Sequence, residues 1–318
     1  MPVVRPPGQG RKARARQRQQ FQQSQEQSTS SSKDQRLLPI LLHAPFLHGN
    51  TMQGRWKGLD HYLSSCTFDN RENDDSIGRL AMDIGMGDAP TTTLEFAAAM
   101  GDAWQIVGTE CHLDRLQRAQ AQLMSHNIHT TVSVAHTGYD FDLSDIVTGE
   151  GSQQKPSILR ALNVFRDYGL QDTCRGMRKL CAQLATDGGI LVEGSASPNG
   201  DVWCVLLANH KCEIVRVLFG TTLPLLNELC WPEEFRKCLP RLWRNYVQTN
   251  HHHHHPWWIQ PIAHLLDEEW KHTACSFADS LKDVPNIEPA WMEHGILVWQ
   301  PPHPIQIPRA EETNLKHA

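Results

Sequence analysis

The sequence has no long hydrophobic run. Of its 318 residues, 40% are hydrophobic and 20% are charged, and the mean hydropathy is −0.46. A membrane-spanning helix needs roughly 18 to 20 consecutive apolar residues. The longest apolar stretch here, around Val202 to Ala208, has only the length of a strand. We therefore expect no membrane span, and a chain that can bury a hydrophobic core.

Cys-x-x-Cys pairs are absent too, although the chain contains nine cysteines. An odd number in a long chain argues against a disulfide scaffold, and the missing pairs argue against a zinc knuckle. These features favour a reducing compartment, and we expect the protein to be cytoplasmic. The His251–His255 run has two interpretations, metal binding or a low-complexity loop. Consecutive histidines on a loop lack the fixed geometry of a structural site, so we predict no metal.

Residues 1–36 have almost no large hydrophobic side chain except Phe21. They carry eight Lys or Arg and two acidic residues, and they are rich in Gln and Ser. This composition predicts a disordered tail. The tail could be a simple solvated segment, a basic arm that contacts RNA or another polyanion, or an organelle-targeting segment. No apolar region of the kind found in secretory signals follows it, and the rest of the chain is acidic, which argues against a nucleic-acid surface there.

Strands and helices alternate from Arg79 onward. Buried-strand and helical spacings predict a doubly wound α/β fold, a mostly parallel sheet with an antiparallel hairpin at one edge. We assign residues 37–222 to this Rossmann-like domain and residues 223–318 to a helical or irregular C-terminal appendage with a helix over Pro261–Ala274. The expected elements are a helix near 56–65, a strand at 79–85, a helix at 92–100, a strand at 104–110, a helix at 113–125, strands at 130–135 and 157–163, a helix at 170–184, a strand at 190–193 and a hairpin at 202–208 and 212–219.

A glycine turn follows the first of these strands, in the segment Asp83-Ile-Gly-Met-Gly-Asp-Ala-Pro90, and Glu110 ends the second strand. Glycines let the backbone approach a ligand, the next helix presents free N–H groups, and an acidic side chain after the second strand can accept hydrogen bonds from both ribose hydroxyls. The pattern predicts a site for an adenosine-containing ligand at the carboxyl edge of the sheet.

The position of the third glycine separates the possible ligands. A dinucleotide fingerprint has Gly or Ala at this position with a free N–H for the pyrophosphate, whereas this loop ends on Ala89 and Pro90. A nicotinamide-dependent oxidoreductase is therefore the weaker interpretation. A helix that begins after Pro90 leaves a looser loop, which suits a ligand without phosphate.

Two segments carry a family resemblance. Leu80-Ala-Met-Asp-Ile-Gly-Met-Gly87 and Ile106-Val-Gly-Thr-Glu110 resemble motifs I and II of class I S-adenosylmethionine-dependent methyltransferases, and Arg160 to Tyr168 with Asp187 to Gly194 is similar to poorly characterised bacterial members. The resemblance covers roughly residues 78–220. It implies a seven-stranded sheet with a reversed last hairpin, methyl transfer to an unidentified acceptor, and S-adenosyl-L-methionine as the cofactor.

The resemblance also implies which residues hold the cofactor. These are the motif I residues and the loop that follows, the glutamate of motif II at the ribose, and an acidic residue after strand three, for which we choose Asp140 with Asp142 as the neighbouring option. The predicted cofactor residues are Asp83, Gly85, Gly87, Asp88, Glu110 and Asp140.

Residues after strands four and five are the candidates for the acceptor side, because ligands bind where the strand order of such a sheet reverses. They are Asn163, Arg166, Tyr168 and Glu193. Three of them also have a structural interpretation: Arg166, like Arg160, would pair with acids, Asn163 would cap a turn, and Glu193 would hold a loop. The tip of strand four reads Asn-Val-Phe-Arg rather than the Asn/Asp-Pro-Pro-Tyr of many amino-group methylases. A catalytically inactive Rossmann-like scaffold is thus an alternative function.

Overall fold

A computed structural model describes residues 52–66, 79–125, 132–144, 146, 154–221, 238–244, 286–288, 291 and 294–309. The chain divides into two units, Met1–Ala44 and Pro45–Ala318, and every described residue belongs to the second. The basic tail, the His251–His255 run and the helix predicted over Pro261–Ala274 lie outside the described residues, so the statements about them stay predictions. Within the described ranges, no helix is both long and apolar enough to cross a membrane.

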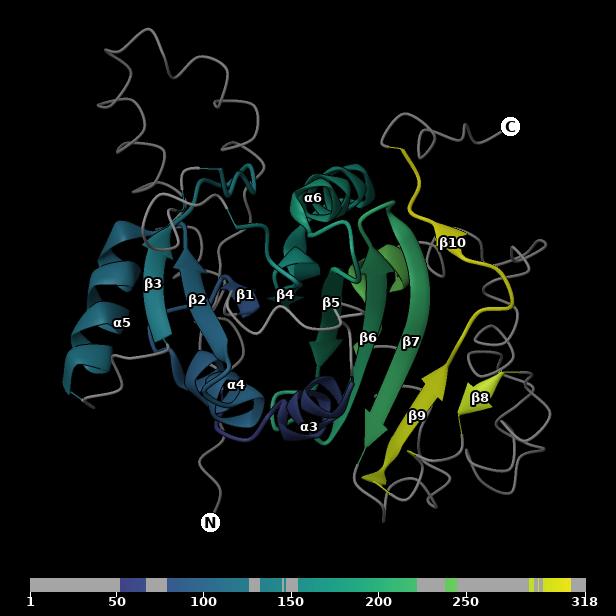
Figure 1. Ribbon diagram of the computed structural model, residues 1–318, viewed down its shortest axis with the longest axis horizontal. Coiled ribbons are helices and arrows are strands. Elements are labelled where there is room, and N and C mark those ends of the chain that lie inside the picture. The colour runs from purple at the N-terminus through teal and green to yellow at the C-terminus, as the bar shows by residue number, and fades with distance from the viewer. Residues whose placement is uncertain are drawn as a thin grey trace, which may run out of the picture. The chain divides into compact units, whose positions relative to one another are not determined.

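Strands and helices alternate as the sequence predicts, from α3 to the β6–β7 hairpin (Figure 1). The elements are α3 (Lys57–Ser65), β1 (Arg79–Ile84), α4 (Thr91–Met100), β2 (Trp104–Glu110), α5 (Leu113–Ser125), β3 (Val132–His136), β4 (Ile158–Leu162), the short 3-10 helix η2 (Phe165–Asp167), α6 (Leu170–Gln183), β5 (Ile190–Ala196), β6 (Val202–Asn209), β7 (Glu213–Thr221), β8 (Ile287–Glu288), β9 (Ile296–Trp299) and β10 (Ile305–Gln306).

One twisted sheet contains all of these strands, in the order β3-β2-β1-β4-β5-β6-β7-β9-β8, and β10 pairs with β7. The first five strands of this order are parallel to one another. The chain moves outward from β1 to β2 and β3 and then returns to β4 on the other side of β1. The strand order therefore reverses between β1 and β4, and ligands of doubly wound sheets bind at the carboxyl ends of strands at such a point.

The antiparallel edge begins at β6, which pairs with β5 and β7. This confirms the predicted fold class and hairpin. The sheet is nevertheless longer than the seven strands implied by the resemblance, because segments near residue 300 add β9, β8 and β10. β9 pairs with the second half of β7 and β10 with its first half. These added strands have two to four residues, too few to show an alternating pattern in the sequence.

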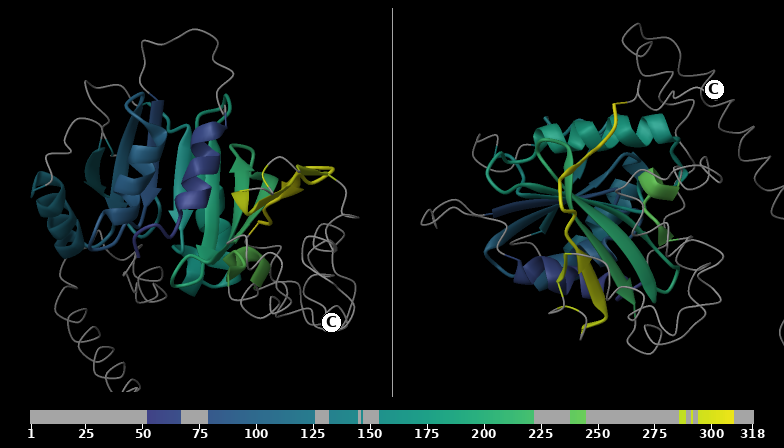
Figure 2. Two further views of the ribbon diagram at one scale, coloured as in Figure 1. Left: turned by 90° about the horizontal axis from the view of Figure 1, so that it is seen from below. Right: turned by 90° about the vertical axis from the view of Figure 1, so that its right-hand side faces the viewer.

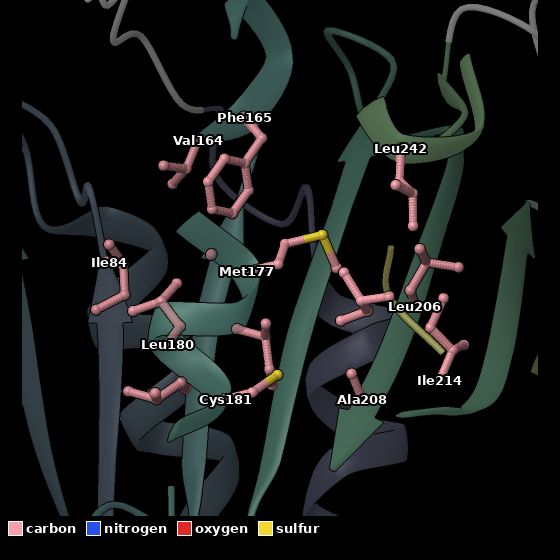
Figure 3. Packing of buried hydrophobic residues seen from close by; sticks show 14 of the residues in the cluster. Ile84, Val164, Phe165, Met177, Leu180, Cys181, Leu206, Ala208, Ile214 and Leu242 are labelled. Carbon is pink, nitrogen blue, oxygen red and sulfur yellow. The ribbon is translucent and has the colours of Figure 1, made fainter. Parts of the chain in front are cut away.

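Helices cover both faces of the sheet, so that α6 lies on one face and α3 on the opposite face (Figure 2). Helices α3, α4 and α5 contribute to one hydrophobic cluster and α6 to the other. Three residues of α6, Cys174, Met177 and Cys181, and its C-cap residue Leu184 are all fully buried. Their spacing of three and four places them on one helical face, as predicted for a core stripe. Met177 and Cys181 lie in the same cluster as Leu206 of β6 (Figure 3).

Candidate functional site

The loop after β1 has the backbone conformation that its glycines allow. Gly85 and Gly87 have φ values of 71° and 81°, in the left-handed region that side chains disfavour. The N–H groups of Gly85 and Met86 both donate to the carbonyl of Thr109 on β2, at 2.8 and 3.0 Å. A Cβ on Gly85 would come within 3.1 Å of Val164, which follows β4. The loop is therefore fixed against the ends of β2 and β4.

Glu110 joins this loop to the end of β2. Its carboxylate is 1% exposed. One oxygen, Oε2, accepts a hydrogen bond from the N–H of Gly87 at 3.0 Å. The other, Oε1, accepts from the N–H groups of Cys111 and His112, at 2.9 and 3.0 Å. The structure thus brings together the glycine loop and the glutamate that the sequence placed 25 positions after Gly85.

Asp83 faces the protein interior rather than the loop. Its carboxylate accepts two hydrogen bonds from Arg160 of β4, both 2.9 Å, and one from the hydroxyl of Thr93, 2.6 Å. The Arg160 guanidinium also donates to Asp60 of α3 and to the carbonyl of Thr92. The pairing of Arg160 with an acid was one of the alternatives read from the sequence. These hydrogen bonds place the Asp83 carboxylate beneath the loop, and a cofactor role for Asp83 stays a prediction.

Burial and the neighbouring charges act in opposite directions on Arg160 and Asp60. Arg160 is 0% exposed. Burial alone lowers its pKa, but the adjacent carboxylates of Asp83 and Asp60 reverse that effect and raise the pKa above the usual value. Burial raises the pKa of Asp60 to about 6, against the opposing effect of Arg160. Arg160 also lies over the ring of Phe96, with 4.2 Å between its Cζ and the ring centroid. The network ties β1, β4, α3 and α4 together.

Two other predicted cofactor residues form ion pairs with helices. Asp88 is paired with Arg115 and Arg118 of α5, at 3.2 and 3.0 Å. Asp140 and its neighbour Asp142 both pair with Lys179 of α6, at 2.9 and 3.3 Å. These exposed or half-exposed pairs hold the loops after β1 and β3 onto α5 and α6. A ligand role for Asp88 or Asp140 stays a prediction.

The sequence did not point to Tyr139, which packs beside the turn that follows Glu110. Its hydroxyl lies 3.1 and 3.2 Å from the two ring nitrogens of His112, and the two rings meet edge to face. Burial and the charge of Arg115 lower the pKa of His112, so the imidazole is neutral at pH 7. His136 is hydrogen-bonded to the carbonyl of Cys111. The only available signal was an aromatic residue in the turn after strand three.

Glu110, Cys111 and His112 form a compact group whose ligand atoms lie within 4.8 Å of one another. Their present bonding does not favour a metal. The Glu110 carboxylate is occupied by backbone N–H groups, and burial followed by the negative charge of Glu110 raises the pKa of the Cys111 thiol to about 12. Because metals bind the thiolate, this trio would have to give up several hydrogen bonds and a proton.

Asn163 connects the tips of β4 and β5. It has a φ of 60°, which Asn tolerates better than most residues. Its side-chain oxygen accepts hydrogen bonds from the Ser195 hydroxyl at 3.0 Å and from the Ala196 N–H at 3.3 Å. Its own N–H donates to Gly194 at 2.7 Å. Asn163 is thereby fixed at the carboxyl edge of the sheet, where the sequence placed the acceptor side.

Arg166 and Tyr168 follow Asn163 and differ in exposure. Arg166 lies on η2 and is exposed. Tyr168 is 8% exposed, and its ring packs against Phe165 and Phe141. Burial and the nearby Cys111 raise the pKa of Tyr168, so the phenol keeps its proton. The structure therefore places Arg166 in solvent and Tyr168 in an aromatic cluster; their acceptor-side roles stay predictions.

Glu193 is buried in the middle of β5, between Ala161 of β4 and Leu206 of β6. Its Oε2 has no hydrogen-bond partner among the described residues. Burial raises the pKa of Glu193 to about 8, although the backbone N–H of Arg241 and the charge of Arg244 oppose the shift. Glu193 is accordingly protonated at neutral pH, and it would accept a proton only under alkaline conditions.

Glu193→Gln should change how stability depends on pH. The folded chain keeps this proton up to about pH 8, whereas the unfolded chain loses it near 4.5. Wild-type stability therefore falls as pH rises between those values, by about 1.4 kcal/mol per pH unit from this group. The amide lacks this titration. We expect similar unfolding free energies at pH 5 and a more stable variant at pH 8, measured by urea unfolding. Glu213→Gln controls for net charge; equal trends in both variants would contradict the assignment.

Arg55 lies at the site, although no sequence motif pointed to it. It precedes α3, is 7% exposed, and donates hydrogen bonds from Nε and Nη2 to the carbonyls of Ser197 and Ala196, at 2.9 and 2.8 Å. Gly200 has a φ of 80°, and a Cβ there would come within 2.7 Å of the Arg55 backbone. This close packing joins the segment before α3 to the end of β5, over a separation of more than 100 residues in sequence.

No protein-family model matches the chain, and no curated protein matches its sequence. Solved structures of similar fold include a protein described as an rRNA methylase of Clostridium thermocellum (15% identity, TM-score 0.32, covering 46% of this chain and 70% of that one). Another is an S-adenosylmethionine-dependent methyltransferase of Geobacter sulfurreducens in complex with S-adenosyl-L-homocysteine (16%, 0.31, 50% and 54%). The match spans little more than half of the latter. With TM-scores this low, function has to be argued from this chain's own residues.

Proposed function

We propose that this chain is a class I S-adenosylmethionine-dependent methyltransferase. One observation carries the proposal: the carboxylate of Glu110 at the end of β2 contacts the N–H of Gly87 in the loop after β1. The contact lies beside the point where the strand order reverses. A glycine loop and an acidic residue joined at this place suit the ribose and the amino-acid portion of an adenosyl ligand.

The residues fit such a ligand. The loop has no Cβ at Gly85 or Gly87, so the backbone can be approached closely. Oε2 of Glu110 accepts a hydrogen bond from the N–H of Gly87 and, as a carboxylate oxygen, can accept a second from a ribose hydroxyl. Pro90 stands at the N-cap of α4 and offers no N–H. This favours S-adenosylmethionine, which has no phosphate, over a dinucleotide.

The chain's own residues position the two reactants and do not remove a proton. Bound S-adenosylmethionine would provide an electrophilic methyl group. Glu110 and the loop would hold the cofactor, while Asn163 and Arg166 border the acceptor at the end of β4. Aligning two reactants in this way contributes a large part of the rate of a displacement. Glu193 is protonated near neutrality, so it is unsuited to remove a proton from the acceptor there.

Isothermal titration of the full chain with S-adenosylhomocysteine tests the proposal. We expect micromolar binding, and no comparable heat with NAD⁺, because Pro90 offers no N–H to a pyrophosphate and the N–H groups of the glycine loop already bind Thr109 and Glu110. Binding of NAD⁺ in preference to S-adenosylhomocysteine would favour the oxidoreductase alternative. No heat and no thermal shift with either ligand would favour a non-catalytic Rossmann-like module.

A further inference from the structure

Arginine side chains gather at the carboxyl ends of β4 and β5. Arg55 is held there by the carbonyls of Ala196 and Ser197, directly after β5. The N–H of Ala196 in turn donates to Asn163 at the end of β4. Arg166 follows Asn163 by three positions, on η2. These bonds place the Arg55 guanidinium and the exposed Arg166 at the same part of the edge.

The segment 238–244 adds two more arginines. Nε of Arg241 donates to the carbonyl of Tyr168, just after η2, at 2.7 Å. The N–H of Arg244 donates to the carbonyl of Pro240, so the segment is one helical turn. Residues three apart on a helical turn share a face, and Arg241 and Arg244 are both half-buried. Leu242 of this turn lies in the hydrophobic cluster with Leu206 and Ile214, which anchors the turn over the sheet (Figure 3).

The positive charges influence one another. Burial, and then the charge of Arg166, lowers the pKa of Arg55. Burial, and then the charges of Arg241 and Arg166, lowers the pKa of Arg244. These directions agree with the hydrogen bonds that place Arg55 beside Asn163 and Arg241 beside Tyr168, at the same part of the sheet edge. The four side chains form a single cluster of positive charge.

Three of these arginines have no carboxylate partner within the described part of the chain. Arg55, Arg166 and Arg241 form no salt bridge there, in contrast to Arg115, Arg118, Arg160 and Arg175, each of which pairs with an aspartate. The buried acid beside the cluster is Glu193, whose pKa of about 8 leaves it uncharged at neutral pH. Holding several cations together without an anion is unfavourable, and a bound anion would remove that cost.

We propose that Arg55, Arg166, Arg241 and Arg244 form a binding site for an oxyanion, a phosphate or a carboxylate group carried by the methyl acceptor. Its assignment to the acceptor rests on the proposed function, whereas anion binding itself does not. The guanidinium is a planar fork that matches the two oxygens of either group. Nε and Nη2 of Arg55 already bind carbonyls, which fixes the direction of its remaining N–H groups.

Titration of the full chain with inorganic phosphate and, separately, with malonate tests the site, with sodium chloride at matched ionic strength as the reference. Arg166→Gln should weaken binding about tenfold, because a hydrogen bond to a charged group is lost. Arg166 is exposed and its side chain makes no hydrogen bond to a described residue, so the variant should fold normally. Arg175→Gln, which removes an exposed arginine of α6, is the matched control and should bind as the wild type does. Arg166→Lys keeps the positive charge but lacks the planar guanidinium, so its affinity for the anion should lie between those of the wild type and Arg166→Gln.

The ligand that binds more tightly identifies the oxyanion. The proposal is overturned if neither anion binds beyond the chloride reference, or if Arg166→Gln and Arg175→Gln weaken binding equally. S-adenosylhomocysteine is titrated in parallel. If phosphate binding depends on Arg166 but S-adenosylhomocysteine does not bind, the oxyanion site stands and the methyltransferase proposal falls. If S-adenosylhomocysteine binds and neither anion does, the methyltransferase proposal stands and the oxyanion site falls.

Discussion

Glu110→Ala is expected to weaken the binding of S-adenosylhomocysteine by roughly 100-fold. Two effects combine. The ribose hydroxyls lose a charged acceptor, and each such hydrogen bond contributes about 1.5 to 3 kcal/mol. The N–H groups of Gly87, Cys111 and His112 also lose their acceptor, so the loop is no longer held in its binding conformation. Isothermal titration measures the change.

Asp114→Ala is the matched control, because it removes a negative charge from the exposed first turn of α5 without touching the loop. It should bind S-adenosylhomocysteine as the wild type does. Glu110→Gln keeps one oxygen acceptor and should show an intermediate loss. Equal affinity in the wild type and Glu110→Ala would remove Glu110 from the cofactor site and leave it a purely structural role in the loop.

Arg160→Met is expected to be the most destabilising single change described in this structure, at about 3 to 5 kcal/mol. It removes the cation and leaves the carboxylates of Asp83 and Asp60 buried without a partner charge. Guanidinium chloride unfolding at pH 7 measures the loss. The loss should shrink at pH 5, because Asp60, whose pKa burial raises to about 6, is then protonated and one of the two buried negative charges is removed.

Arg160→Met combined with Asp83→Asn and Asp60→Asn tests the cause, because neutral side chains remove the uncompensated charges. This triple variant should recover part of the lost stability. Arg175→Met, at an exposed pair on α6, should change the unfolding free energy by less than about 1 kcal/mol. A loss below about 1 kcal/mol in Arg160→Met as well would show that the network contributes little to folding.

The sequence predicted the doubly wound half of the fold closely. The strand at Trp104–Glu110 and the helix at Leu113–Ser125 have the observed bounds. Both have regular apolar spacing and clear ends, so the local sequence pattern determines their bounds. The strand from Ile190 continues to Ala196 instead of stopping at Glu193. A glutamate followed by glycine and serine looked like the end of a strand, but pairing with β6 keeps Gly194 extended; a Cβ there would meet Cys204 and Val205.

The candidate site was predictable where it follows from local motifs. Gly87 and Glu110 lie close together because each follows one of two adjacent parallel strands, and the strand-helix-strand spacing in the sequence predicts this arrangement. The contact of Arg160 with Asp83 joins β4 to β1, and the sequence offered it only as one alternative. Arg55 and Arg241 could not be found, because contacts far apart in the sequence place them at the sheet edge. The protonated state of Glu193 depends on burial, which a single sequence does not display.

The pairing of β7 has a consequence for the biosynthesis of the chain. Its outer edge is covered in two pieces, by β9 along Val217 to Gly220 and by β10 along Glu213 and Ile214. Both strands lie more than 70 residues after β7 in the sequence, so β7 is synthesised well before they are. Until then the nascent chain presents a hydrophobic strand with unpaired N–H and C=O groups, a template for pairing with other chains. Completion of the sheet is thus a late step, and the interval before it is when the chain depends most on protection from aggregation.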